Sequence, residues 1–132
     1  ALNLRDLEPY PLLVREAGSG TRKACEEYFQ QKRVHFPQKY EISSLEAVRE
    51  GVVAGLGLAL LPRHSVTQEL ANGRLLELPV EELPLYRSWC VVHARGKRLS
   101  PVAQAFLDYI RSERTQISAL GQTFSGYCPT AH

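Results

Sequence analysis

The order of apolar runs and amphipathic stretches limits the possible folds of this chain more than any other feature. A short apolar run over residues 10–16 predicts a strand, and apolar residues recur at helical spacing from Thr21 onward. A brief strand around residues 40–42 and a second helix follow. Leu58 to Leu61 is nearly continuous apolar sequence closed by Pro62, which is typical of a strand buried on both faces. Strands that alternate with helices favour an α/β fold with a largely parallel sheet.

Each predicted helix has one apolar face. Ser43 stands three residues before Glu46, the spacing of a capping box that begins the second helix. A short helix over residues 63–72 and a strand over residues 75–78 come next. The side chains expected to point inward are Ala24, Cys25, Tyr28 and Phe29 in the first helix, Leu45, Val48 and Val52 in the second, and Val66, Leu70 and Ala71 in the third.

The last third of the chain predicts one strand, one helix and an irregular tail. Residues 86–93 (YRSWCVVH) have the composition of a strand, with Trp89 and Cys90 in the core. Ser100 followed by proline predicts the start of a helix. The expected buried face of that helix comprises Val102, Ala103, Phe106, Leu107 and Ile110. Residues 115–132 have little periodicity, so we expect no regular structure there.

The segment REAGSGTR (residues 15–22) is the most informative one for function. A strand ends, a glycine-rich turn follows and a helix begins, which gathers free backbone N–H groups and the positive end of a helix dipole around one point. The hydroxyls of Ser19 and Thr21 add donors, Gly18 and Gly20 permit close approach, and Arg22 can clamp a carboxylate or phosphate. A capped turn with an exposed arginine is the alternative interpretation. The spacing of a Walker A loop is absent.

No residue pattern indicates catalysis or metal binding. The three cysteines are widely spaced with no CxxC motif, and none of the four histidines has metal-ligand spacing on one element. Cys25 falls on an apolar helix face with no base placed beside it, and Ser19 lacks the G-x-S-x-G pattern of a hydrolase. We therefore predict no catalytic residue, no metal site and no cofactor.

Charge and length argue against several other classes of protein. The chain has 132 residues and a net charge of +2, with interspersed charges rather than the basic stripe of a nucleic-acid binder. Its longest largely apolar run, residues 52–62, is far too short to span a bilayer, and no signal peptide opens the chain. We expect a cytoplasmic protein. A start at Ala1 and the absence of methionine are what a piece of a longer chain would show, and removal of an initial Met before Ala would give the same start.

Four motifs occur in the order found in one known family. They are LLVREAGSGTR, EISSLEAVREGVVAGLGLALLPRHSV, GRLLELPV and SWCVVHARGKRLSPVAQAFLDYI. Together they resemble the effector-binding domain of LysR-type transcriptional regulators over residues 1 to about 113. REAGSGTR and VVAGLGLALLP are most similar to the subgroup that controls carbon-fixation (RuBisCO operon) genes.

The resemblance implies a periplasmic-binding-protein-like (type II) fold of two α/β subdomains around an effector cleft. Residues 1–79 resemble most of the second subdomain, and residues 80–114 resemble the strand and helix that return to the first. The tail, residues 115–132, lies outside the resemblance. Against the family pattern, the N-terminal winged helix-turn-helix, the first half of the first subdomain and the opening strand of the second are missing. The domain is therefore expected to be incomplete, and to reach DNA only through the missing part.

The resemblance also implies where the effector binds. The glycine-rich turn faces the cleft, and the end of the 58–61 strand lies near it. The effector-binding residues implied are Glu16, Gly18, Ser19, Gly20, Thr21 and Arg22, with Leu60, Leu61 and Pro62 nearby. The expected effector is a small anionic metabolite, phosphorylated or carboxylate, and the expected assembly is a homodimer or tetramer with no membrane partner. Two other classes remain open: a transport solute-binding protein of the same fold, and a small hydrolase using Ser19 or Cys25.

Overall fold

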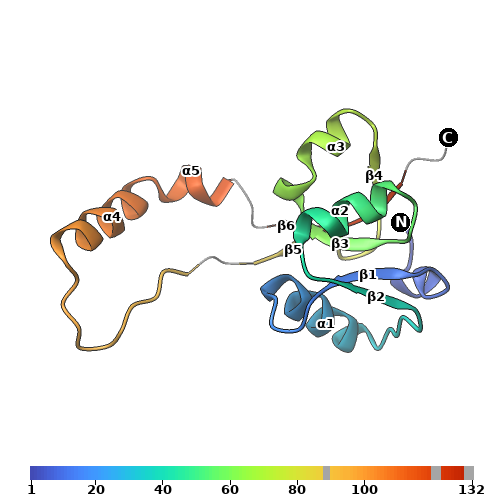
Figure 1. The fold of residues 1–132 in the computed structure, drawn as a ribbon, viewed down its shortest axis with the longest axis horizontal. Helices are drawn as coiled ribbons and strands as arrows, with labels where there is room; N and C mark the ends of the chain where they lie inside the picture. Colours follow the sequence, from blue (N-terminus) through green and yellow to red (C-terminus); the bar gives the residue numbers. More distant parts are fainter. Residues whose placement is uncertain (88–89, 120–122, 130–132) are drawn as a thin grey trace.

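A computed structural model describes residues 1–87, 90–119 and 123–129, with main chain only for the last range. The chain has a compact body and a separate helical arm (Figure 1). The strands are β1 (Leu12–Arg15), β2 (Lys39–Ile42), β3 (Ala59–Pro62), β4 (Leu75–Glu77), β5 (Leu85–Tyr86) and β6 (Thr123–Pro129). The α-helices are α1 (Gly20–Lys32), α2 (Leu45–Val53), α3 (Thr67–Ala71), α4 (Pro101–Ser112) and α5 (Arg114–Ala119), with 3₁₀ turns η1 (Leu4–Leu7) and η2 (Arg63–Ser65).

The strands of the body run mostly in one direction. β1 and β2 pair in parallel, and a parallel bridge between Leu12 and Leu58 joins β1 to the start of β3. β6 pairs antiparallel with β3, β4 and β5, so these three strands share a direction and β6 alone runs against it. The predicted α/β class with a largely parallel sheet is confirmed.

One face of the sheet packs against α1 and the N-terminal turn. The four predicted inward residues of α1 (Ala24, Cys25, Tyr28 and Phe29) are all buried, as the sequence predicted. Cys25, Tyr28 and Phe29 join Leu12 and Leu60 in one apolar cluster. Because α1 covers this face directly after β1, the turn between them is fixed at the edge of the sheet.

The other face packs against α2 and α3. Val48 and Val52 are buried as predicted, and they join Leu13, Leu61 and others in a second cluster. The capping prediction was wrong by one residue, because the Ser44 hydroxyl accepts the Ala47 N–H at 3.1 Å and Ser43 precedes the cap.

Close contact between the chain after α2 and the start of β1 depends on one glycine. A Cβ atom at Gly57 would stand 2.3 Å from the carbonyl oxygen of Pro11, inside any allowed contact. The Leu58 N–H donates to that same carbonyl at 2.9 Å. Gly57 therefore permits the hydrogen bonds that attach β1 to the β3 segment.

The third helix is shorter than predicted and has a different inward face. Val66 is fully buried and Leu70 half-buried, but Ala71 is exposed, so that part of the prediction was wrong. Glu69 is buried in its place and pairs with Arg49 of α2, whose Nε lies 3.3 Å from Glu69 Oε1. An ion pair between α2 and α3 thus replaces the apolar contact expected from spacing.

The strand predicted over residues 86–93 is wrong beyond its first residue. β5 ends at Tyr86, and the described residues 87 and 90–93 lie outside any strand, while Ser88 and Trp89 lie outside the described residues. Cys90, expected in the core, is exposed, and Val92 is 86% exposed. Among the described residues β5 pairs with β6 alone, and residues 87 and 90–93 have no described strand beside them with which to form a ladder.

The predicted helix at residues 101–112 is confirmed, but the prediction that its apolar face is buried is wrong. Ser100 caps α4 by accepting the Ala103 N–H at 3.2 Å, with proline in the first turn. Yet α4 contains no buried residue, and Val102 is 80% and Phe106 63% exposed. The arm of α4 and α5 projects away from the body (Figure 1), so no described element of the body covers its apolar side, and Ala103, Leu107 and Ile110 are only half-buried.

The irregular tail predicted after residue 114 is also wrong. Residues 114–119 form α5, and residues 123–129 form β6 at the centre of the second group of strands. The segment has no apolar period, but strand pairing satisfies its backbone groups whatever its side chains are. The predicted tail positions 120–122 and 130–132 lie outside the described residues.

Candidate functional site

Two helices begin at the edge of the sheet where β1 and β2 end. Parallel pairing brings the carboxyl ends of both strands to the same edge, and α1 and α2 start there. Each helix has a serine cap, Ser19 for α1 and Ser44 for α2. Each helix N-terminus carries about half a positive charge and unpaired N–H groups. This edge, which we call the β1–β2 edge, is the candidate site.

The turn before α1 has the geometry that its glycines predicted. Gly18 adopts φ of +91°, in the left-handed region, and the Ser19 N–H donates to the Glu16 carbonyl at 3.2 Å. The Ser19 hydroxyl accepts the Arg22 N–H at 3.4 Å. The N–H groups of Gly20 and Thr21 are in the first turn of the helix and have no acceptor within it. They are the free donors of this edge.

Arg22 is held by groups of three elements. Its Nε donates to Glu26 of α1 at 2.8 Å and its Nη1 to the carbonyl of Arg15 at 3.1 Å. Nη1 also donates to the carboxylate of Glu41 on β2. These hydrogen bonds from Arg22 to Glu26 and Glu41 raise the pKa of its guanidinium. The arginine predicted as an anion clamp therefore joins β1, β2 and α1 in the ligand-free molecule.

A second arginine, which the sequence prediction missed, lies at the same edge. Arg15 makes a bidentate contact with Glu16, from Nε to Oε2 at 2.7 Å and from Nη2 to Oε1 at 2.8 Å. The hydrogen bonds from Arg15 lower the pKa of the Glu16 carboxyl, and the same hydrogen bonds raise the pKa of the Arg15 guanidinium. Arginine at the end of a strand, next to a glycine-rich turn predicted to bind an anion, was the available signal.

The carboxylates outnumber the arginines at this edge. Glu46 belongs to it as well, because it lies in the first turn of α2 and accepts a hydrogen bond from the Ser44 hydroxyl at 2.9 Å. Its own pKa is lowered by hydrogen bonds from its backbone N–H and the Ser44 hydroxyl. The edge holds Arg15, Arg22, Glu16, Glu26, Glu41 and Glu46. Two helix N-termini and two arginines thus face internal carboxylates, and an anionic ligand must compete with these for the same donors.

The other predicted site residues are only partly brought to this edge. Pro62 ends β3, which runs parallel to β1, so it lies at the same edge of the sheet as Glu16. Leu60 and Leu61 are 5% and 1% exposed and belong to the two core clusters on opposite faces of the sheet. These two leucines support the edge from within the core, and their side chains do not line it.

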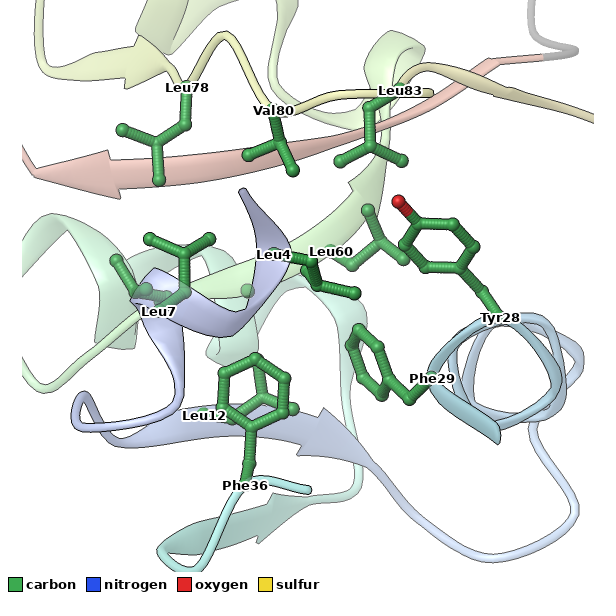
Figure 2. Close-up of a pocket in the computed structure, with 12 residues that line it drawn as sticks. Leu4, Leu7, Leu12, Tyr28, Phe29, Phe36, Leu60, Leu78, Val80 and Leu83 are labelled. Atoms are coloured by element: carbon green, nitrogen blue, oxygen red, sulfur yellow. The ribbon is translucent and has the colours of Figure 1, made fainter. Parts of the chain in front are cut away.

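The apolar cavity of the molecule is separate from this edge. It lies between α1, η1 and the segment around Val80 and is lined by aliphatic and aromatic side chains, among them Leu4, Phe29 and Leu60 (Figure 2). Its volume of about 20 Å³ is near that of one water molecule. The cavity is a packing defect of the core and too small for a metabolite.

Catalytic alternatives find little support in the described residues. Burial raises the pKa of the Cys25 thiol to about 12, and its Sγ donates to the Leu60 carbonyl at 3.5 Å. A thiol of this kind is protonated and unreactive at neutral pH. Within the described ranges no three histidine, cysteine or acidic side chains are grouped to hold a metal ion. In the same ranges no helix is both long and apolar enough to cross a membrane.

The fold and this edge define the class of the protein. A mostly parallel α/β unit with helices on both sheet faces and a donor-lined edge belongs to the periplasmic-binding-protein-like (type II) class of ligand-binding domains. The model of the LysR substrate binding domain matches residues 1–115. The chain therefore belongs to the LysR substrate-binding-domain family, as its motifs predicted.

The curated relatives are transcriptional regulators by name, and one of them is named a RuBisCO operon regulator. The chain is 42% identical to the transcriptional activator CmpR of Synechocystis over 89% of this chain and 38% of CmpR. It is 47% identical to the regulator CbbR of Xanthobacter flavus over 82% of this chain and 33% of CbbR. A RuBisCO operon regulator of Acidithiobacillus ferrooxidans is 41% identical over 80% of this chain and 36% of that regulator. The chain thus spans about a third of the length of these relatives.

One solved structure is similar throughout most of the chain. It is the regulatory domain of CcmR from Synechocystis PCC6803 in complex with 2-PG, with a TM-score of 0.77 and 33% identity. The match covers 84% of this chain and 53% of that chain. These relatives favour a regulatory domain over a transport protein of the same fold.

Proposed function

We propose that this chain is the ligand-sensing part of a LysR-type transcriptional regulator and that it binds a small anionic metabolite at the β1–β2 edge. The observation that carries the proposal is the meeting of two serine-capped helix N-termini at one sheet edge. The similarity to a regulatory domain in complex with 2-PG makes 2-PG the first compound to test. Homology to regulators and the unreactive Cys25 argue against an enzyme.

In this proposal the ligand receives hydrogen bonds from the first turn of α1. The free N–H groups of Gly20 and Thr21 and the Thr21 hydroxyl bind the anionic group, while Gly18 keeps the approach open. Arg22 turns part of its guanidinium from Glu41 to the ligand. Glu16 holds Arg15 at the rim, and Pro62 closes the side next to β3.

The proposed domain arrangement gives this edge a second wall. In this arrangement residues 1–79 form most of one subdomain and residues 80–114 return to another, and a match to 53% of the CcmR regulatory domain is consistent with a partial domain. The uncovered apolar side of α4 supports this, because Val102 and Phe106 need a surface to pack on. Leu2 and Val80 form an isolated parallel bridge, so the first residues of the chain and the segment after β4 lie side by side.

Ligand binding in the cleft then acts by population shift. A ligand that contacts both walls stabilises one relative placement of the subdomains, and it shifts that equilibrium by no more than its differential affinity. In the cytoplasm, a dimer or tetramer of the whole regulator would pass this change to DNA-binding domains outside this chain.

The test uses 2-PG and calorimetry on the full regulator and on this chain. Thr21→Val removes one hydroxyl at the edge and is expected to weaken 2-PG binding about tenfold, the cost of one good hydrogen bond. Thr115→Val makes the same change at an exposed position of α5 and is expected to have no effect. Equal 2-PG affinities of the unmodified protein, Thr21→Val and Thr115→Val would contradict the proposed site.

A second variant tests the competition between internal carboxylates and the ligand. Glu41→Gln removes the negative charge that lies beside the guanidinium of Arg22, and it keeps the length of the side chain at position 41. We expect it to tighten 2-PG binding several-fold, because the arginine is released to the anion. Weaker or unchanged binding would show that Arg22 only joins the strands and does not contact the ligand.

A further inference from the structure

The part of the chain that leaves the body, residues 80–87, lies against α1, and we call it the exit segment. The Tyr28 hydroxyl of α1 donates to the Glu81 carbonyl at 3.2 Å. One turn further along α1, the Lys32 ammonium pairs with the Glu82 carboxylate. The second half of α1 thus holds the exit segment both by its backbone and by a side chain.

The same contact has an apolar part and a second ion pair. Tyr28 is 4% exposed and shares one core cluster with Val80, while Leu83 packs against that cluster. Figure 2 shows the Tyr28 ring pointing from α1 toward the segment that carries Val80 and Leu83. Further along, the Glu27 carboxylate pairs with the Arg87 guanidinium, at 3.1 Å between Oε2 and Nη2. α1 therefore contacts the exit segment at several points along its length.

The exit segment contains a strained residue close to a contact with the start of the chain. Glu82 has φ of +62°, in the left-handed region that residues other than glycine rarely adopt. Such a conformation costs energy and persists only where its surroundings hold it. Lys32 pairs with this residue, and the neighbouring Glu81 N–H donates to the Leu2 carbonyl at 2.9 Å. Loss of these contacts would let Glu82 relax, so the exit segment can adopt a held and a relaxed state.

The two ends of α1 serve different surfaces. The first turn carries the N–H groups of Gly20 and Thr21 at the β1–β2 edge. Tyr28 follows Thr21 by two turns, about 10 Å along the helix axis. Because a hydrogen-bonded helix is a rigid element, a displacement of its first turn also moves Tyr28.

We propose that Tyr28 and Lys32 are positioning residues that hold the exit segment and make this hold depend on the ligand at the first turn of α1. This role rests on the proposed function, which puts the ligand at the β1–β2 edge and a second subdomain beyond the exit segment. Hydrogen bonds from the first turn to the ligand displace α1, and the contacts with Glu81 and Glu82 change with it. The direction in which the chain leaves the body then differs between the two states, and the second subdomain moves accordingly.

Hydrogen exchange of the ligand-free chain tests the hold. Tyr28→Phe removes only the hydroxyl, and the hydrogen-bonded amides of Glu81 and Leu83 should exchange about fivefold faster, the effect of one lost hydrogen bond. The Leu13 amide of β1 should be unchanged. Tyr40→Phe makes the same change at an exposed tyrosine of β2 and should affect none of these amides. Unchanged exchange at Glu81 and Leu83 in Tyr28→Phe, or an equal increase at Leu13, would overturn the proposed hold.

A second variant tests the ion pair. Lys32→Gln removes the charge beside Glu82 and should accelerate exchange at Glu81 about twofold, because a half-exposed ion pair contributes less than a buried hydrogen bond. Lys23→Gln makes the same change at an exposed lysine in the first half of α1 and should leave the rate unchanged. Equal rates in the two variants would remove Lys32 from the proposal.

A titration with 2-PG, followed by NMR of the ¹⁵N-labelled chain, tests the coupling. The amides of Gly20 and Thr21 report on the ligand site and those of Glu81 and Leu83 on the exit segment, and all four signals should shift along one binding curve. In Tyr28→Phe the first pair should shift as before and the second pair by about half as much or less, which a purely structural role of the hydroxyl would not produce.

The same titration separates failure of the coupling from failure of the ligand site. In the unmodified chain, shifts at Gly20 and Thr21 with none at Glu81 and Leu83 would overturn the coupling and leave the ligand site standing. The absence of any shift at Gly20 and Thr21 would contradict the proposed function itself, and with it the coupling.

Discussion

The body and the arm are built from similar sequence signals and reach opposite degrees of burial. α1 and α4 both begin with a serine cap and both carry apolar residues at helical spacing. In α1 four of these residues are buried, and in α4 none is. An amphipathic pattern therefore predicts a helix and its apolar side, but only a neighbouring element turns that side into core.

The largest expected effect compares one apolar residue of each region, one buried and one exposed. Leu61 is 1% exposed, so Leu61→Ala should lower the free energy of unfolding by about 3 kcal/mol through lost burial and a cavity. Phe106 is 63% exposed, and Phe106→Ala should change it by less than about 0.5 kcal/mol. Urea unfolding followed by circular dichroism measures both. Similar losses would mean that the arm packs on the body in solution.

A glycine substitution tests the attachment of β1 within the body. Gly57→Ala places a methyl group against the Pro11 carbonyl and should cost about 2 kcal/mol or more of unfolding free energy. Gly20→Ala is the matched control, because a Cβ there meets nothing within 4 Å. That variant should be neutral or slightly stabilising by thermal unfolding. A neutral Gly57→Ala would contradict the close contact between these segments.

The helix caps sharpen the same comparison. Ser19→Ala removes the cap of α1, and we expect about 1 kcal/mol lower unfolding free energy, since this helix is part of the core. Ser100→Ala removes the equivalent cap of α4 and should reduce only the helical signal of the arm. Global unfolding should be unchanged in that variant. A shared loss of stability would show that the two regions unfold together.

The smallest effect is a pH dependence that arises from the buried thiol. The pKa of Cys25 is about 12 in the folded chain and near 9 in the unfolded one. Above pH 9 the unfolded chain releases a proton that the folded chain keeps, so stability is full below pH 9 and falls as pH rises. Between pH 9 and 10 the loss should be about 1 kcal/mol. In Cys25→Ala the unfolding free energy should no longer show this fall between pH 9 and 10. In Cys90→Ala the fall should remain.

The sequence was sufficient to predict elements whose stability comes from residues near them in the chain. The strand at β3, the apolar side of α1 and the cap of α4 were predicted correctly from local patterns. The strand at 86–93 and the inward side of α4 were not, because both required neighbouring elements that the described part of the chain does not place there. β6 escaped prediction because backbone pairing, rather than apolar spacing, forms it.

The candidate site was predictable in its backbone and not in its charges. Gly18, Ser19 and the first turn of α1 lie as the motif indicated. The contact between Arg22 and Glu41 joins residues of different elements, so no local pattern reveals it. The same holds for Glu46, which the start of α2 brings to the edge.

The most direct test of a ligand site at this edge is a titration of the ¹⁵N-labelled chain with 2-PG, followed by NMR. The amide signals of Gly18, Gly20 and Thr21 should shift progressively with ligand, while those of the arm at Val102 and Phe106 should stay in place. The same titration with Thr21→Val should give smaller shifts at equal ligand. Shifts spread evenly over the body, or confined to residues away from α1, would contradict the account.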